Sequence, residues 1–390
     1  MATVRAFAPG RTELAGNHTD HQGGRAIAAT LDCGIEIAFE RNGGKRIRFA
    51  SEGFEPFEID IDAGAAGPRA EEAGTTAALV RGVVDLLVEA GLAVGGFDAK
   101  ASSTIPSGGG LSSSAALELA LICGLQELFS CGSGPLDTPA ERAAAAARVE
   151  REYFGKPCGL LDQTAIAYGG VSAIDFSGDS EAPFVEAIDF DFASCGYALC
   201  LIDTHCDHSL YTDEYARVAQ DMFDVASFLG ATRLCEVSEV EFEARLSEVR
   251  SALGDLPALR ALHYYHEMEL VGEREAALMR GDLQAFLELT RRSGASSAQY
   301  LQNVSTSDRS AQPAMVALAL ADCAAGSEGA CRIHGGGFGG TVQAFVPVDA
   351  CDTFARRIDA QLGAGSCKEY RITARGAYAE IGRASCRERV

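Results

Sequence analysis

A glycine-rich segment, Pro106 to Ala116, lies between the strand-like stretch FDAKASSTI and an apolar helical run. Its three consecutive glycines, Gly108, Gly109 and Gly110, can adopt backbone dihedrals that other residues avoid, so that their N–H groups can approach an anion. The helical run that opens at Leu111 places this loop at a helix N-terminus, where unpaired N–H donors and the helix dipole favour phosphate. The segment therefore predicts a nucleotide-binding loop that joins a strand to a helix.

Three serines follow the glycines directly. Ser112, Ser113 and Ser114 suit the first turn of a helix, where their hydroxyls can cap the helix, bind phosphate oxygens or ligate a hard cation. The loop is not a Walker A motif, because that motif requires a lysine and none occurs between residues 101 and 129. A flexible glycine–serine connector is the alternative, but the strand before the loop and the helix after it argue against a loose linker.

The chain has 390 residues, enough for two domains with their own cores. Its 33 basic and 55 acidic residues give a net charge of −22, which argues against a nucleic-acid or anionic-membrane surface. No stretch approaches the length needed to span a bilayer, and the thirteen cysteines include no CxxC pair. We therefore expect a cytoplasmic protein with no membrane or nucleic-acid partner and with mostly reduced, buried cysteines. The group Cys200, His205, Cys206 and His208 fits no standard zinc-finger spacing.

Two further segments carry candidate chemistry. Pro9 to Gly24, PGRTELAGNHTDHQGG, is dense in side chains that can hydrogen-bond a polyol, although a solvated turn would show the same composition. In GKPCGLLDQ, Asp162 lies between apolar residues beside a short helical turn. A half-buried carboxylate needs a partner or a function, so that Asp162 either caps this turn or handles a proton.

Hydrophobic periodicity predicts a mixed α and β chain with a break near residue 190. Strands are expected from Ala26 to Phe57, with Asn42 and Gly43 as a hairpin turn, and again in YALCLIDT after Cys195. The predicted helices are 75–89, the run after the glycine loop, 139–153, 213–229, 237–253, 258–279 and 283–301.

In order and position, PGRTELAGNHTDHQGG, PSGGGLSSSAA and IHGGGFGGTVQAFVP resemble the three motifs of the GHMP small-molecule kinases. The first is most similar to the galactokinase signature, and GKPCGLLDQ is similar to the galactokinase segment that carries the catalytic aspartate. The resemblance spans the chain from about Arg5 to Val346. It implies an α+β, two-domain GHMP kinase fold: a ribosomal-S5-like N-terminal domain (1–190), a ferredoxin-like C-terminal domain (195–383) and a tail (384–390).

The resemblance also implies a sugar 1-kinase that uses ATP and Mg²⁺ to make a sugar 1-phosphate and ADP, as a monomer or weak homodimer. Asp162 matches the catalytic aspartate beside the anomeric hydroxyl, and Arg11 matches the arginine next to it. The other positions that match family sites fall into three groups: sugar-binding Asn17, His18, Asp20, Gly159 and Tyr215; ATP-binding Gly108, Gly109, Gly110, Leu111, Ser112, Ser113 and Ser114; and metal-binding Ser114 and Glu150. Gly335 to Gly340 matches a close-approach loop at the edge of the active site.

Several positions depart from the galactokinase pattern. The usual glutamate before HTD is Asn17, the usual tyrosine after it is His21, and the arginine of the family's RHSL is Asp207. Loss of a carboxylate and gain of an imidazole would reduce repulsion of a C6 carboxylate, so galacturonate and N-acetylgalactosamine remain alternatives to galactose. TTAALVRGV lacks the family's aromatic and asparagine at the adenine edge. A sugar sensor without turnover is the alternative from another class, although Ser114, Asp162 and Arg11 are all present.

Overall fold

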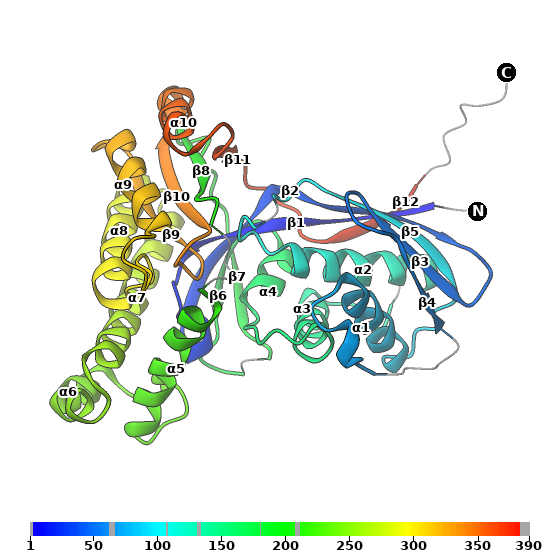
Figure 1. The fold of residues 1–390 in the computed structure, drawn as a ribbon, viewed down its shortest axis with the longest axis horizontal. Coiled ribbons are helices and arrows are strands. Elements are labelled where there is room, and N and C mark those ends of the chain that lie inside the picture. The colour runs from blue at the N-terminus through cyan, green and yellow to red at the C-terminus, as the bar shows by residue number, and fades with distance from the viewer. Residues whose placement is uncertain are drawn as a thin grey trace.

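The computed structural model describes residues 3–61, 67–106, 108–130, 134–179, 181–206 and 211–382. Its larger sheet has the strand order β12-β1-β2-β5-β3-β4, and β6, followed by β7, extends it from the first residues of β2 (Figure 1). The bounds of these strands are β1 (Thr3–Ala15), β2 (Arg25–Arg41), β3 (Arg46–Ser51), β4 (Phe57–Asp60), β5 (Phe97–Ser103), β6 (Val171–Asp175), β7 (Phe184–Ile188) and β12 (Tyr378–Gly382).

Four helices pack against one face of this sheet (Figure 1). They are α1 (Thr76–Glu89), α2 (Ser113–Ser130), α3 (Pro139–Val149) and α4 (Leu161–Tyr168). The residues of α2 are buried on nearly every side, which fits a helix that is apolar all round and lies centrally between the sheet and the other helices. This central helix starts directly at the glycine-rich loop.

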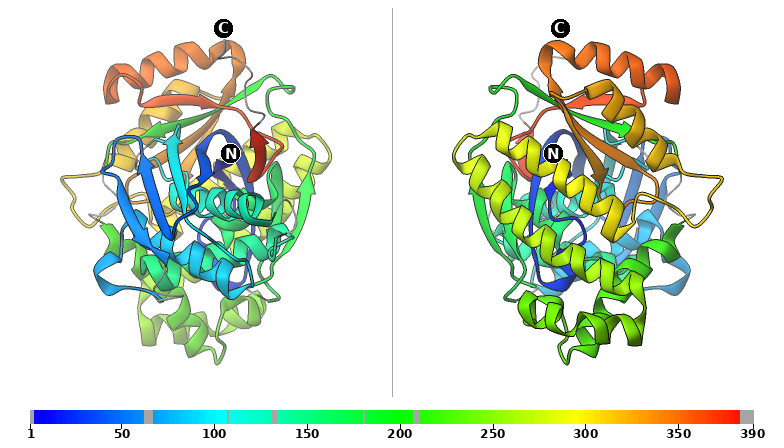
Figure 2. Two further views of the ribbon diagram at one scale, coloured as in Figure 1. Left: turned by 90° about the vertical axis from the view of Figure 1, so that its right-hand side faces the viewer. Right: turned by 90° about the vertical axis from the view of Figure 1, so that its left-hand side faces the viewer.

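The smaller sheet is antiparallel, with the order β11-β8-β10-β9. Its strands are β8 (Tyr197–Asp203), β9 (Ala330–His334), β10 (Thr341–Pro347) and β11 (Cys367–Tyr370), and α9 (Pro313–Ala325) and α10 (Val348–Leu362) pack on one face. The remaining helices are α5 (Thr212–Phe228), α6 (Glu239–Leu253), α7 (Asp255–Met279) and α8 (Leu283–Ser296). In Figure 2, α7 and α8 run side by side along one flank of the molecule.

One continuous apolar core links the two sheets. The ring of Phe192 lies 5.3 Å from that of Phe286 in α8 and 4.9 Å from that of Phe345 in β10, measured between centroids. These rings belong to the same buried cluster as Ile37 and Phe39 of β2. Burial of this apolar surface holds the two halves of the chain in one arrangement, and the segments between them form the site described below.

Two features of the sheet differ from the sequence expectations. Asn42 and Gly43 do not close a hairpin, because β5 lies between β2 and β3 and hydrogen-bonds to both. The end of the chain also does not stay with the smaller sheet: Ile372 bridges to Leu31, and β12 pairs with β1 of the larger sheet. This return covers an otherwise unpaired edge of β1, and it places residues 378–382 outside the predicted 195–383 domain.

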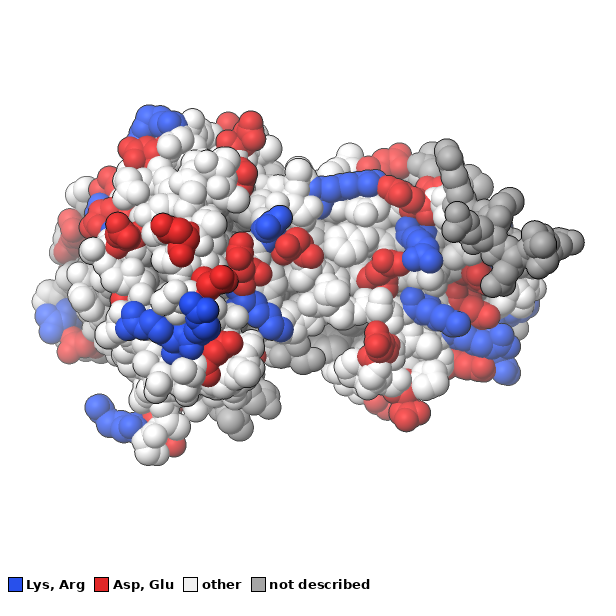
Figure 3. Space-filling view, turned by 90° about the horizontal axis from the view of Figure 1, so that it is seen from above, with Lys and Arg blue, Asp and Glu red and all other residues white. Residues whose placement is uncertain are grey.

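The helices agree with the periodicity to within a few residues. The expected helix 139–153 is an α-helix only to Val149 and continues as a π-turn, Glu150–Phe154. The expected helix 283–301 likewise ends in a π-turn, Ser297–Leu301. Within the described ranges, no helix combines the length and the apolar character needed to cross a membrane. On the face seen in Figure 3, the Lys and Arg side chains of the described residues lie among Asp and Glu side chains.

Candidate functional site

The glycine-rich loop has the backbone conformation that its sequence predicts. Gly108 and Gly110 have φ values of +74° and +65°, which side chains with a Cβ rarely adopt. The carbonyl oxygen of Gly109 accepts a 2.8 Å hydrogen bond from Thr341 Oγ1, and that of Gly110 accepts a 2.6 Å bond from Arg11 Nη1. The loop is therefore held from both sides, by β1 and by β10, at the N-terminus of α2.

Arg11 and Asp162 form an ion pair next to this loop. Strand β1 carries Arg11, the first turn of α4 carries Asp162, and Arg11 Nε donates to Asp162 Oδ1 at 2.8 Å. Ser112 Oγ donates to the other carboxylate oxygen. Burial by itself would raise the pKa of Asp162, but the charge and hydrogen bond of Arg11 and the hydrogen bond of Ser112 outweigh burial and hold this pKa below its usual value. Asp162 is therefore a carboxylate at neutral pH.

The π-turn after α3 directs Glu150 into the protein. The Glu150 side chain is 2% exposed and accepts hydrogen bonds from Ser114 Oγ at 2.8 Å, Gln163 Nε2 at 2.6 Å and Lys156 Nζ at 3.1 Å. A π-turn inserts one residue into the helical repeat and re-aims the side chains that follow, which is why such turns are frequent at functional sites. No pattern in the sequence marks this turn, because its residues continue the helical periodicity.

The donor set around Glu150 fits a hard divalent cation. A hydroxyl and a carboxylate oxygen, from Ser114 and Glu150, are the ligand types that Mg²⁺ prefers. One turn further along α2 lies Glu118, which is fully buried and has no hydrogen-bond partner for either carboxyl oxygen among the described residues. Burial and, next, the charge of Glu150 raise the pKa of Glu118 well above its usual value. A cation here would relieve this concentration of acidic groups.

A second group of polar side chains lies on the other side of Asp162. Asp20 begins the short turn Asp20–Gln22 and lies so close to Gly159 that a Cβ on Gly159 would collide with its carboxylate. Tyr215 of α5 packs its ring over Gly336 and lies 5.3 Å from the His18 ring, centroid to centroid. Burial, followed by the charges of Asp20 and Asp162, raises the pKa of Tyr215. Asp20 therefore lies against Gly159, and the carboxylates of Asp20 and Asp162 are both close enough to Tyr215 to act on its hydroxyl group.

The side chain of Asn17 lies among protein groups. Its side chain is fully buried and engaged by protein: Nδ2 donates to the Gly335 carbonyl at 2.5 Å, and Oδ1 accepts from Asn303 Nδ2 at 2.8 Å and Ser297 Oγ at 3.3 Å. The structure therefore gives Asn17 the role of a link between the first motif and the glycine loop at 335–340. The assignment of Asn17 to the sugar site stays a prediction.

His18 and His21 also contact each other. His18 Nδ1 lies 3.4 Å from His21 Nε2, and His18 Nε2 lies 3.1 Å from the Gly336 carbonyl oxygen. Burial lowers the pKa of His18 to about 3 and that of His21 to about 4. Both imidazoles are neutral at pH 7, so His21 supplies no positive charge to a sugar acid.

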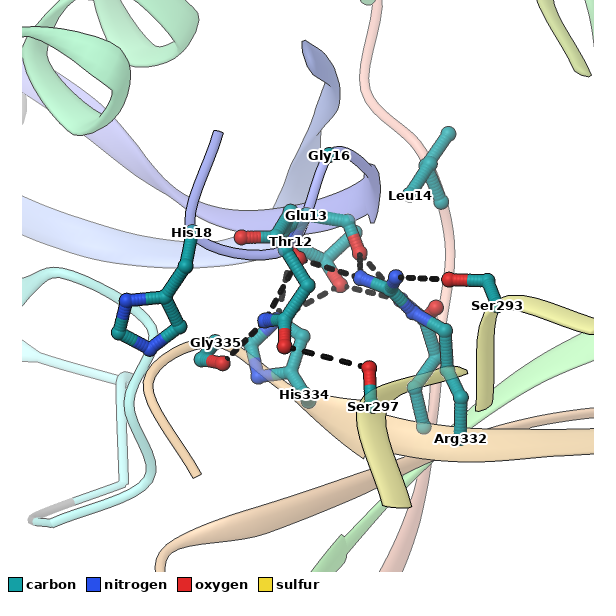
Figure 4. Close-up of polar contacts among 12 residues, drawn as sticks. Thr12, Glu13, Leu14, Gly16, His18, Ser293, Ser297, Arg332, His334 and Gly335 are labelled. Atoms are coloured by element: carbon teal, nitrogen blue, oxygen red, sulfur yellow. Dashed lines mark hydrogen bonds and ion pairs between the residues drawn. The ribbon is translucent and has the colours of Figure 1, made fainter. Parts of the chain in front are cut away.

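A buried ionic network lies behind the first motif and was not predicted from the sequence. Arg332 of β9 donates through Nη2 to Glu13 Oε1 at 2.5 Å and through Nη1 to Ser293 Oγ at 3.2 Å (Figure 4). Glu267 of α7 pairs with Arg274. Burial alone would raise the pKa of Glu267, but Arg274, with His263 and Arg332, outweighs it and lowers this pKa to about 2. The only sequence signal was the presence of charged residues within apolar runs.

The remaining positions from the sequence analysis are the group of cysteines and histidines, Asp207 and Ser112. Among the described residues, no three His, Cys, Asp or Glu side chains are grouped as a metal site, and the cysteines found there are free thiols. His208 and Asp207 lie outside the described residues. Ser112 has a φ of +60°, and its carbonyl oxygen accepts the first hydrogen bond of α2, from the Ala116 N–H at 3.0 Å. Ser112 therefore caps α2 while its hydroxyl contacts Asp162.

Comparison with known proteins identifies two family regions in the chain. Residues 78–170 match the GHMP kinases N terminal domain, and residues 2–41 match the galactokinase galactose-binding signature. The chain is 30% identical over 367 residues to a galactokinase of Streptomyces coelicolor, covering 94% of this chain and 90% of that protein. It is 29% identical to a galactokinase of Glaesserella parasuis, covering 90% of this chain and 87% of that protein.

Solved structures give the same result for the fold. The Lactococcus lactis galactokinase complexed with galactose superposes with a TM-score of 0.80 at 25% identity, over 96% of this chain and 94% of that one. The mevalonate kinase of L. major is similar in fold, with a TM-score of 0.65 at 19% identity over 95% of this chain and 96% of that one. The α+β, two-domain GHMP kinase fold that the motifs imply is therefore confirmed.

Proposed function

The chain belongs to the galactokinase family of the GHMP kinases, and on that premise we propose that it transfers the γ-phosphoryl group of ATP to the C1 hydroxyl of galactose. The observation that carries the proposal is the position of the Arg11–Asp162 pair. It lies directly beside the glycine-rich loop on one side and beside Asp20, Gly159 and Tyr215 on the other. A sugar hydroxyl placed at Asp162 would therefore face a phosphoryl group held by the loop.

The roles of the residues in this reaction follow from their environments. The N–H groups of the glycine-rich loop, Ser112 and Ser113 bind the phosphates at the N-terminus of α2. Ser114 and Glu150 hold Mg²⁺, which neutralises negative charge on the phosphates when it is bound. Arg11 keeps Asp162 ionised and offsets charge on the transferred group.

Asp162 acts chiefly by orienting the attacking hydroxyl. Its lowered pKa makes it a weak base, whereas an ionised carboxylate accepts a hydrogen bond from the C1 hydroxyl strongly and aims its oxygen at phosphorus. Phosphoryl transfer depends mainly on positioning and charge neutralisation, so this role is sufficient. As the bond between the C1 oxygen and the γ-phosphorus forms, the bond from that phosphorus to the β,γ-bridging oxygen breaks and ADP leaves with this oxygen. The hydroxyl proton passes to Asp162 late in this step.

Galactose is the acceptor that the environment of the site favours. Neutral His18 and His21 provide no counter-charge for a C6 carboxylate, and the nearby Asp20 and Asp162 would repel one. Asp20 and Tyr215 instead offer hydrogen-bonding groups for the hydroxyls of a neutral hexose.

The test is ADP release from purified protein with Mg-ATP and, in separate reactions, galactose, galacturonate, N-acetylgalactosamine, glucose or no sugar. Stimulation by galactose well above the other sugars is expected, with Asp162→Asn as the inactive control. A preference for galacturonate or N-acetylgalactosamine would overturn the assignment of the acceptor. No stimulation by any sugar, together with intact ATP binding, would favour a sensor.

We further propose that the protein acts in the cytoplasm as a monomer or weak homodimer. The free thiols among the described cysteines fit a reducing compartment, and ATP is an intracellular co-substrate. Size-exclusion chromatography with light scattering, at two protein concentrations, tests the oligomeric state.

A further inference from the structure

Lys156 lies at the proposed cation site, although no positively charged residue was predicted there from the sequence. It follows the π-turn that carries Glu150, directly after Gly155, whose φ is +83°. Its Nζ lies 3.1 Å from Glu150 Oε1, the same oxygen that accepts the 2.8 Å hydrogen bond of Ser114 Oγ. The ammonium group thus lies beside the Glu150 oxygen that would ligate Mg²⁺.

The partners of Glu150 connect Lys156 to the glycine-rich loop. Ser114, which donates to the same Glu150 oxygen, lies in the first turn of α2, directly after that loop. A phosphate bound at the N-terminus of α2 would therefore lie near the Glu150–Lys156 pair.

The two members of this pair differ in exposure and in the number of groups that hold them. The Lys156 side chain is 57% exposed, whereas that of Glu150 is 2% exposed and held by Ser114 and Gln163 as well. A lysine has a flexible four-carbon stem that can carry its charge to a new partner, while Glu150 has no such freedom. A divalent cation bound at Glu150 would repel the ammonium group from its present position.

We propose that Lys156 is a catalytic residue that neutralises Glu150 while the cation site is empty and moves to the γ-phosphoryl group when Mg²⁺ binds. The inference rests on the proposed function, because it assumes a cation at Ser114 and Glu150 and ATP at the glycine-rich loop. In a chain of net charge −22, a mobile cation at this point also offsets the repulsion between the protein and the phosphates.

The test compares Lys156→Met, Lys156→Arg and a matched control, Lys100→Met, in which the exposed lysine of β5 is replaced. The first readout is Mn²⁺ binding to the nucleotide-free protein, measured by electron paramagnetic resonance. Because the competing ammonium is removed, Lys156→Met should bind Mn²⁺ about 3- to 10-fold more tightly than wild type. Lys100→Met should match wild type.

The second readout is nucleotide affinity, measured by calorimetry with Mg²⁺ and either ADP or the non-hydrolysable analogue AMPPNP. Lys156→Met should bind AMPPNP about 10-fold more weakly and ADP normally, because only AMPPNP has the γ-phosphoryl group that the charge would contact. Lys156→Arg should recover most of the difference, since guanidinium also binds phosphate. With galactose as acceptor, kcat should fall about 100-fold in Lys156→Met at unchanged KM for the sugar.

Two results would overturn the proposal. Equal loss of affinity for ADP and AMPPNP would mean that Lys156 only supports the shape of the loop. Unchanged or weaker Mn²⁺ binding in Lys156→Met would show that the ammonium does not compete for the cation site. Neither binding measurement uses a sugar. Both would therefore still test the role of Lys156 if the protein did not phosphorylate galactose.

Discussion

Arg11 Nε donates a 2.8 Å hydrogen bond to Asp162 Oδ1 and so joins residues 151 positions apart in the chain. The arginine side chain is 10% exposed and the aspartate side chain 33%, which leaves one side of the carboxylate open. Arg11 also binds the carbonyl oxygen of Gly110, so a single guanidinium sets the position of both Asp162 and the glycine-rich loop. The first prediction concerns this pair.

Asp162→Asn should lower kcat by about 10²- to 10⁴-fold, because an amide presents one acceptor oxygen without charge to the attacking hydroxyl. Arg11→Ala should also lower kcat by orders of magnitude. The affinity for Mg-ATP in Asp162→Asn should change by no more than about twofold, since the carboxylate touches no part of the proposed nucleotide site except through Ser112. Steady-state kinetics and calorimetry measure the two quantities, and near-normal turnover in both variants would remove the catalytic assignment.

Gly159→Ala should impair sugar use selectively. A Cβ at Gly159 would collide with the carboxylate of Asp20, and the backbone there has no positive φ that would add strain. Displacement of Asp20 should lower kcat/KM for galactose about 10- to 100-fold while leaving ATP affinity intact. Gly178→Ala is the control, because its new Cβ would meet no atom within 4 Å. Equal kinetics for the two variants would contradict the placement of Asp20 at the sugar.

The affinity for galactose should depend on pH through Asp20. Burial is the main reason that the pKa of Asp20 is raised to about 6, so the carboxylate becomes protonated as the pH falls through 6. Since a carboxylate accepts stronger hydrogen bonds from sugar hydroxyls than a carboxyl group does, KM for galactose should rise below pH 6. A pH series of kcat/KM tests this, and Asp20→Asn should show a weaker and flatter profile between pH 5 and 7.

The same residue should lower stability at neutral pH. An aspartate in the unfolded chain has a pKa of about 3.9, so folding with a pKa of about 6 favours the protonated form. The resulting stabilisation is present below about pH 4 and is lost as the pH rises through 6. Asp20→Asn should therefore raise the free energy of unfolding at pH 7 by at most about 3 kcal/mol, since the folded pKa lies about two pH units above the unfolded one, and leave it unchanged at pH 3.5. A urea titration at each pH measures this, and a destabilised variant at pH 7 would contradict the prediction.

Arg332→Met should destabilise the protein severely. It would leave Glu13 without its buried partner, and loss of one member of a buried pair costs about 3–5 kcal/mol. Arg356→Met, at an exposed position of α10, should change the free energy of unfolding by less than about 0.5 kcal/mol. Adding Glu13→Gln to Arg332→Met should restore part of the loss, because the uncompensated charge is then absent. A loss below about 1 kcal/mol in Arg332→Met would show that water reaches this pair.

The strongest predictions from the sequence concern local features. Gly108 and Gly110 have the positive φ values that three successive glycines permit, and the helix that follows begins at Ser113 as its apolar run requires. Capping, glycine conformation and hydrophobic periodicity depend on a few neighbouring residues, so they can be inferred without the fold. The same holds for the family motifs, whose order along the chain was enough to indicate a GHMP kinase fold.

By itself, the sequence determined the glycine-rich loop, the helices and the fold class. It also determined that a motif rich in polar side chains precedes this loop in the chain. Only the tertiary structure decided that Asn17 turns into the protein, that Glu13 meets Arg332 across 319 positions, and that β12 returns to β1. The physical reason is that these features depend on contacts between segments that are far apart in the chain. Side-chain direction, buried charge pairing and strand order depend on which distant segments pack together, and no neighbouring residue specifies that choice.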